Sequence, residues 1–190
     1  MVRVLGIDPG TANTGYGVVA QTGARLVALD GGVIETSPDL LPERRLATIH
    51  ARVAELLAEH EPDAVAIEDL YFGVNARSAF AVGQARGVVM LAAGQAGVPC
   101  AGYTPQQIKS AVCGSGRADK SQVARMVQAL LALPELPTPD HASDALGAAI
   151  CHVNRAPLAG ALPASSGNGT RTGTVPALAA AIAAAGAGGR

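Results

Sequence analysis

Two short apolar runs, each ending in a carboxylate, constrain this chain more than any other feature. Residues 4–8 read VLGID and residues 64–68 read AVAIE. Such runs are typical of buried strands, and a carboxylate at the end of one is costly to desolvate without a cation or a strong donor. A third acid, Asp144, follows His141 by three residues at a predicted helix start. The pattern indicates a divalent-metal site of the kind that supports phosphodiester chemistry.

Apolar periodicity and turn signals divide the first 155 residues into alternating elements. We expect strands at residues 2–8, 15–21, 25–36, 64–68 and 98–103. We expect helices at residues 42–60 and 76–96, from 104–105 onward, from about 119 onward, and from 138–139 to about 155. The first three strands form an antiparallel meander, and a helix between two strands requires a parallel crossover. The expected fold class is therefore α/β, a five-stranded mixed sheet with three antiparallel and two parallel strands, flanked by helices.

Composition places one domain at residues 1–155 and a different kind of segment after it. Residues 156–190 are rich in Gly, Ala, Ser, Thr and Pro and have few large apolar groups. Such a segment buries little surface, so we expect a low-complexity, disordered tail, loosely helical near residues 178–185 and without chemistry.

Cysteine usage and hydropathy argue against several classes of protein. The three cysteines lie far apart without a CxxC pair, which indicates neither a disulfide framework nor a zinc site. No apolar run approaches the roughly 18 residues of a membrane span, and no leader pattern precedes the first strand. We expect a cytoplasmic protein that does not associate with membranes.

The formal net charge of -1 hides an uneven distribution. Residues 70–130 carry six basic groups and one acid, and the basic groups are Arg77, Arg86, Lys109, Arg117, Lys120 and Arg125. This block is either a phosphate-binding surface or a set of ordinary solvated helix faces. Charge alone does not decide between these readings.

Six short motifs lie in an order that narrows the class further. They are GIDPGT at 6–11, TGYG at 14–17, AIE at 66–68, GQARG at 83–87, KSQV at 120–123 and SDAL at 143–146. Over residues 1–155 the chain resembles the RuvC family of crossover junction endodeoxyribonucleases, the bacterial Holliday junction resolvases. The opening GID motif alone also occurs in the actin, sugar kinase and Hsp70 ATPase fold. The resemblance implies the RNase H-like fold.

The resemblance also implies four liganding positions that hold two divalent cations, Mg²⁺ or Mn²⁺. Asp8, Glu68 and Asp144 match three of them, with Asp8 as the candidate bridge between the cations. At the fourth, where many relatives have Asp, this chain has His141. Asp140 is the alternative, because both residues share a helix face with Asp144. We favour His141, which is in register with the family, and because imidazole suits Mn²⁺ better than Mg²⁺ we expect Mn²⁺ to be preferred.

The implied substrate is a four-way DNA junction. Lys109 and Lys120 match basic positions beside the scissile phosphate, and Lys120 is included among the catalytic candidates. Weaker candidates for contacts to the duplex arms are Arg77, Arg86 and Arg117. Either Tyr71 or Phe72 is expected to stack on an unpaired base at the junction centre, and the alternative for each is core packing.

Three glycines, Gly83, Gly87 and Gly94, interrupt the predicted helix at 76–96, which they should weaken. Their presence indicates close approach of another element. The resemblance implies a homodimer built partly on this helix, and the alternative is packing on the chain's own sheet.

The function expected from the sequence is metal-dependent resolution of Holliday junctions by paired symmetric nicking, in recombination and repair. The resemblance adds a branch-migration complex of RuvA and RuvB type proteins as partners. Three alternatives are an RNA-processing nuclease of the YqgF type, a phosphate-loop ATPase or sugar kinase, and a non-catalytic junction-binding protein. The kinase requires a second, duplicated domain, for which 190 residues leave no room.

Overall fold

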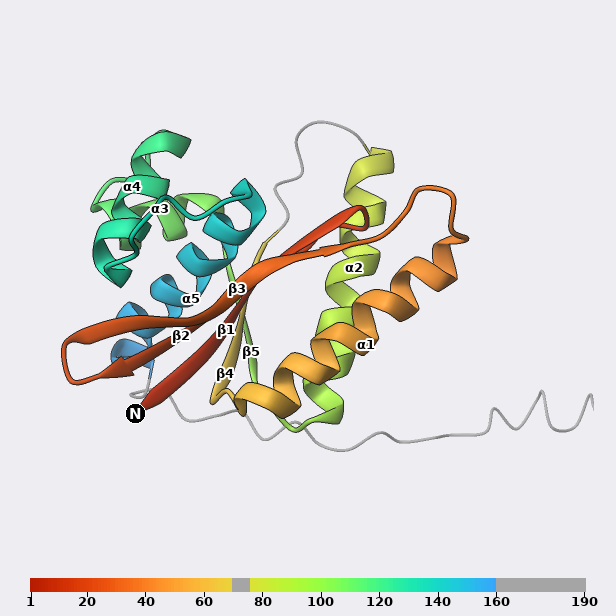
Figure 1. Ribbon diagram of the computed structural model, residues 1–190, viewed down its shortest axis with the longest axis horizontal. Helices are drawn as coiled ribbons and strands as arrows, with labels where there is room; N and C mark the ends of the chain where they lie inside the picture. The colour runs from red at the N-terminus through yellow and green to blue at the C-terminus, as the bar shows by residue number, and fades with distance from the viewer. Residues whose placement is uncertain (70–75, 160–190) are drawn as a thin grey trace, which may run out of the picture. The chain divides into compact units, whose positions relative to one another are not determined.

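The computed structural model describes residues 1–69 and 76–159, drawn in colour in Figure 1. Its strands are β1 Val2–Asp8, β2 Asn13–Thr22, β3 Arg25–Glu35, β4 Ala64–Glu68 and β5 Cys100–Tyr103. Its helices are α1 Pro42–His60, α2 Ala76–Gln95, α3 Pro105–Cys113, α4 Lys120–Leu131 and α5 Asp140–Ala159. Within these described segments, no helix combines the length and the apolar character needed to cross a bilayer.

The five strands form one mixed sheet in the order β3-β2-β1-β4-β5. The β1–β2 and β2–β3 pairs are antiparallel, whereas β1–β4 and β4–β5 are parallel. Ile7 lies beside Ile67 in the parallel pair, so Asp8 and Glu68 end neighbouring strands at the same edge of the sheet. The predicted five-stranded RNase H-like fold is confirmed.

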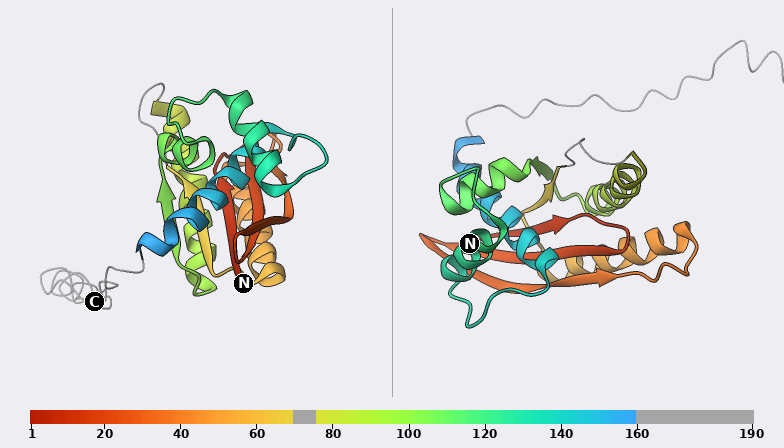
Figure 2. Two further views of the ribbon diagram at one scale, coloured as in Figure 1. Left: turned by 90° about the vertical axis from the view of Figure 1, so that its left-hand side faces the viewer. Right: turned by 90° about the horizontal axis from the view of Figure 1, so that it is seen from above.

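Helices cover both faces of the sheet (Figures 1 and 2). The layer of α1 and α2 packs on Leu5, Ile7 and Val18, and the layer of α3, α4 and α5 packs on Val4 and Val19. Successive strand residues point to opposite faces, so β1 and β2 need apolar side chains at nearly every position. This requirement explains the buried apolar runs at residues 4–7 of β1 and 18–20 of β2.

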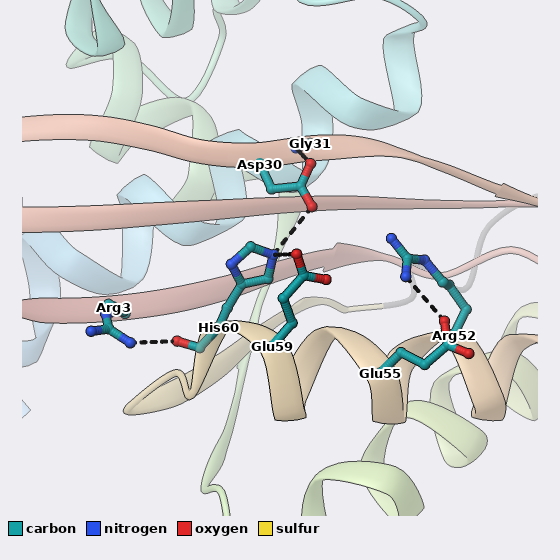
Figure 3. A network of polar contacts seen from close by, with 7 residues as sticks. All are labelled: Arg3, Asp30, Gly31, Arg52, Glu55, Glu59 and His60. Atoms are coloured by element: carbon teal, nitrogen blue, oxygen red, sulfur yellow. Dashed lines mark hydrogen bonds and ion pairs between the residues drawn. The ribbon is translucent and has the colours of Figure 1, made fainter.

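The C-terminal end of α1 is fastened to the sheet by polar contacts, shown in Figure 3. Arg3 Nη1 donates to the His60 carbonyl at 2.8 Å, and His60 Nε2 lies 3.2 Å from Asp30 Oδ2. Arg3 is near the start of β1, so this attachment lies at the opposite end of that strand from Asp8.

The element boundaries lie within a few residues of the sequence expectations. Strand β5 begins at Cys100 rather than 98, because the Val98 N–H donates to the Ala93 carbonyl and Pro99 has no N–H. Helix α5 begins at Asp140 and runs to Ala159. Helix α4 begins as expected, since Asp119 and Gln122 form a reciprocal capping box.

Candidate active site

Three separate elements bring the predicted acids to one edge of the sheet. Asp8 ends β1, Glu68 ends β4, and Asp144 lies in the second turn of α5. Glu68 and Asp144 line one pocket of about 190 Å³ together with Lys109 and Lys120. The structure thus brings together acids that are 60 or more residues apart in the sequence.

Missing side chains on β1 and β2 allow α5 to lie directly on the sheet. A Cβ atom on Gly15 would lie 2.0 Å from the His141 carbonyl oxygen, and one on Gly6 would lie 1.9 Å from that of Ala145. A Cβ atom on Gly17 would lie 2.6 Å from Leu146 Cδ2. Atoms do not approach this closely, so any side chain at these positions would push α5 away. These glycines therefore place the first turns of α5 within reach of Asp8.

His141 contacts the site directly. Its Nδ1 atom lies 2.7 Å from Asp8 Oδ2, and the two side chains are 42% and 20% exposed. Asp140 is 74% exposed, and its Oδ2 atom lies 3.2 Å from Nζ of Lys120, which also contacts Asp144. Of the two candidates left open by the sequence, His141 contacts the predicted ligand Asp8, whereas Asp140 contacts Lys120.

Lys120 brings a positive charge from α4 to the same acids. Its Nζ atom lies 3.5 Å from Asp144 Oδ2 as well as beside Asp140. Burial works against the ammonium form, but the two carboxylates outweigh it and raise the pKa of Lys120. The lysine is therefore fully charged at neutral pH.

The negative charges of the three acids repel one another. Burial, together with the negative charges of Asp8 and Asp144, raises the pKa of Glu68 to about 7, although Lys120 and Lys109 lower it. Burial and the charge of Asp8 also raise the pKa of Asp144, against the effect of Lys120. The site therefore holds more negative charge than its surroundings solvate at neutral pH.

The donor set fits a hard divalent cation, although the side chains are not arranged around one. Among the described residues, no group of three Asp, Glu, His or Cys side chains is already placed to hold a metal ion. Asp8 and Asp144 instead contact His141 and Lys120. Carboxylate oxygens and one imidazole are suitable ligands for Mn²⁺ or Mg²⁺. A cation would also offset the negative charges of Asp8 and Asp144, which help to raise the pKa of Glu68. To bind a cation, these side chains would exchange their present partners for it.

The remaining predicted residues lie in several places. Arg117 and Arg125 line a groove of about 510 Å³ beside α4. Arg86 is not a free surface charge, because its Nη2 atom lies 2.8 Å from Asp69 Oδ1. Tyr71, Phe72 and the side chain of Arg77 fall outside the described residues.

The sequence reasoning missed Asp69 as a partner of Arg86. The signal was an acid directly after Glu68 and an arginine inside the GQARG motif, but only the fold places the two together.

The outer face of α2 is open and apolar. Within the part of the chain that the structure describes, a Cβ atom on Gly87 or Gly94 would meet nothing within 4 Å. Phe80 and Leu91, which lie on the same helix, are 69% and 54% exposed, while the opposite side, including Val89, is buried. Packing on the chain's own sheet therefore does not explain Gly87 and Gly94.

The fold and the acid cluster define an RNase H-like protein whose side chains suit phosphodiester hydrolysis. The family model described as "Crossover junction endodeoxyribonuclease RuvC" matches residues 4–152. The chain belongs to this RuvC family.

Individual relatives show the same similarity over most of their length. The crossover junction endodeoxyribonuclease RuvC of Moorella thermoacetica is 52% identical over 154 residues, which cover 81% of this chain and 92% of the relative. The solved structure of Thermus thermophilus RuvC is 43% identical with a TM-score of 0.78, over 83% of this chain and 97% of that one. The same protein in complex with Holliday junction substrate is 44% identical with a TM-score of 0.81, over 84% and 97% of the two chains.

Proposed function

We propose that this chain is an endonuclease that resolves four-way DNA junctions by paired symmetric nicking, in recombination and DNA repair. The observation that carries the proposal is the convergence of Asp8, Glu68 and Asp144 beside Lys120, in a chain of the RuvC family. The similar Thermus thermophilus protein in complex with Holliday junction substrate supports the choice of DNA over the RNA of a YqgF-type nuclease. We expect the reaction to take place in the cytoplasm.

Asp8, Glu68, His141 and Asp144 are the proposed ligands of two divalent cations, which when bound would activate a water molecule and stabilise the leaving oxygen. The central position of β1 in the sheet makes Asp8 the candidate shared ligand. Lys120, released from Asp144, would face the phosphate and offset the charge that develops on it in the transition state. Lys109 lines the same pocket and would assist.

The proposed DNA surface extends from this pocket over the basic middle of the chain. Arg117 lines the groove beside α4 and is suited to a duplex-arm phosphate, as is Arg77 at the start of α2. Tyr71 or Phe72, in the segment that follows β4, would stack on an unpaired base.

We also propose a homodimer that forms through the outer face of α2. Gly87 and Gly94 leave open space there, and Phe80, Met90 and Leu91 leave apolar surface beside it. Small residues allow a second backbone to approach closely, and a two-fold axis would give two identical sites. This symmetry matches the approximate symmetry of a four-way junction, whose resolution requires two cuts. Proteins of the RuvA and RuvB type are the expected partners in branch migration.

Cleavage of a labelled four-way junction, with and without Mg²⁺ or Mn²⁺, tests the proposal. Wild-type protein should make paired nicks only with a divalent cation. Asp8→Asn, Glu68→Gln and Asp144→Asn should each abolish nicking and still bind the junction. Asp39→Asn, which changes an exposed acid in the turn before α1, should cleave normally. Metal-independent nicking, cleavage of structured RNA in preference to the junction, or normal activity of the three site variants would contradict the proposal.

A further inference from the structure

An arginine on α2 is tied to the residue that follows Glu68. Arg86 Nη2 lies 2.8 Å from Asp69 Oδ1. The backbone of Asp69 is held as well, because its N–H donates to the Tyr103 carbonyl at 2.8 Å and so continues the β4–β5 ladder past Glu68. Asp69 is thus fixed at both its backbone and its side chain.

The space that the Asp69 carboxylate occupies depends on a glycine of β5. A Cβ atom on Gly102 would lie 2.4 Å from Asp69 Oδ1 and 2.7 Å from Oδ2. Gly102 pairs with Ile67, one residue before Glu68. The absence of a side chain at Gly102 therefore lets the carboxylate lie over the edge strand, where the guanidinium of α2 reaches it.

The Arg86 guanidinium is poorly placed to contact a phosphate. Its side chain is only 24% exposed, and its Nη1 atom is buried without a hydrogen-bond partner in the described part of the chain. Holding a partly buried cation costs free energy unless an anion is paired with it, and removal of one partner leaves the other uncompensated. The pair is therefore expected to resist displacement by DNA.

We propose that Arg86 is a positioning residue, which through Asp69 fixes the end of β4 and thereby the Glu68 carboxylate. This inference rests on the proposed function, since it assigns Glu68 to the cation site. It differs from the sequence expectation that Arg86 contacts a duplex arm.

Two substitutions with opposite changes in charge test this role. Arg86→Ala removes the cation and Asp69→Asn removes the anion, yet both should release the end of β4. We expect both to lower kcat for junction cleavage and the affinity for Mn²⁺, measured by calorimetry without DNA, by about 10-fold to 100-fold. The dissociation constant of the junction should change by less than about twofold. Arg86→Lys, which keeps the charge but loses the planar guanidinium, should recover part of both losses.

A matched control separates positioning from general stability. Asp30→Asn weakens the His60–Asp30 contact between α1 and β3, in which Asp30 is 30% exposed compared with 37% for Asp69. Asp30→Asn should lower the melting temperature about as much as Asp69→Asn does. Unlike Asp69→Asn, it should leave kcat and Mn²⁺ affinity unchanged.

The alternative, in which Arg86 contacts a DNA phosphate directly, makes opposite predictions. If Arg86 contacts phosphate, Arg86→Ala weakens junction binding and leaves kcat and Mn²⁺ affinity intact, while Asp69→Asn frees the arginine and strengthens binding. Either result overturns the proposal. If wild-type protein cleaves no junction, the proposed function fails, and the Mn²⁺ measurements still decide the role of Arg86, because unchanged affinity in both variants contradicts it.

Discussion

Glycines occupy two contrasting settings in this protein, one on the sheet and one on α2. On β1 and β2, the positions of the missing side chains at Gly6, Gly15 and Gly17 are filled by α5 of the same chain. On α2, a Cβ atom at Gly87 or Gly94 would meet no atom of the described residues within 4 Å. The first group lets the chain's own backbone form the site, whereas the second leaves space that no described residue of the chain fills.

The contrast shows why a glycine motif has no meaning without its surroundings. Gly15 lies against the carbonyl of the proposed ligand His141, in the first turn of α5, and the proposed ligand Asp144 lies in the next turn. Gly87 lies among exposed apolar side chains. Filling the two positions should therefore have opposite effects on the stability of the protomer.

The largest expected effect comes from Gly15→Ala. The added methyl group would overlap the His141 carbonyl, so α5 must shift outward and carry His141 and Asp144 away from Asp8. A displacement near 1 Å costs on the order of 100-fold in rate, and overpacking costs about 1–3 kcal/mol of unfolding free energy. Junction cleavage and chemical denaturation measure the two losses.

Gly31→Ala is the matched control for this prediction. Gly31 lies on the same sheet, and its added Cβ would meet nothing closer than 3.6 Å. Cleavage should remain near the wild-type rate. Equal activity of Gly15→Ala and Gly31→Ala would show that the close approach of α5 does not set the geometry of the site.

The next prediction concerns pH, because burial and the neighbouring carboxylates raise the pKa of Glu68 in the site that α5 completes. Glu68 has a pKa of about 7 in the folded protein compared with 4.5 for an unperturbed carboxyl, so the folded state retains a proton that the unfolded chain has lost. The metal-free protein should therefore lose stability as pH rises from about 4.5 to 7. Cation binding must displace this proton, so Mn²⁺ affinity should rise by up to about tenfold per pH unit below pH 7 and level off above it.

Calorimetry in buffers of different ionisation enthalpy counts the released proton. Glu68→Gln should flatten the pH dependence, both of stability and of any residual Mn²⁺ binding. A slope that survives this substitution would assign the proton to another group.

A smaller effect is expected from the choice of metal. The proposed ligand His141 would give the site one nitrogen donor, so wild-type protein should cleave faster with Mn²⁺ than with Mg²⁺, by about tenfold or less. His141→Asp should bring the two rates together, while Asp140→Asn should preserve the difference. Equal rates with the two ions in the wild type, or a Mn²⁺ advantage that persists in His141→Asp, would exclude the proposed role of the imidazole.

The smallest effect is predicted for Gly87, on the exposed face of α2. Gly87→Ala should stabilise the isolated protomer by about 1 kcal/mol, because alanine favours the helix and the added methyl group would meet no described atom of the chain within 4 Å. The same methyl group would hinder a second α2, so the dimer dissociation constant should rise by about tenfold. Sedimentation equilibrium measures this shift, and unchanged dimerisation would place the interface elsewhere.

The sequence predicted those parts of the site that depend on local patterns. Asp8 and Glu68 were identifiable because each ends an apolar run, and parallel pairing then places them together. Asp144 and His141 followed from helix spacing and from the family motif. The start of α4 was likewise predicted within one residue, at about Asp119.

Features that depend on contacts between distant elements were not predictable in this way. The purpose of Gly15 appears only when α5 lies against it, and the pairing of Arg86 with Asp69 requires the packing of α2 beside β4. A charge count includes Arg86 in the basic block, but the count carries no information on the burial of Arg86 or on its pairing with Asp69. The exposure of Gly87 likewise depended on which face of α2 the sheet would cover.

The most direct test of the central claim is to locate Mn²⁺ by anomalous scattering in crystals of this protein with a four-way junction. The account predicts two manganese peaks at the edge of the sheet, both bound by Asp8, with Glu68, Asp144 and His141 completing the sites and Lys120 turned from Asp144 toward a phosphate. Manganese bound elsewhere, with the His141–Asp8 and Lys120–Asp144 contacts intact beside the DNA, would contradict it.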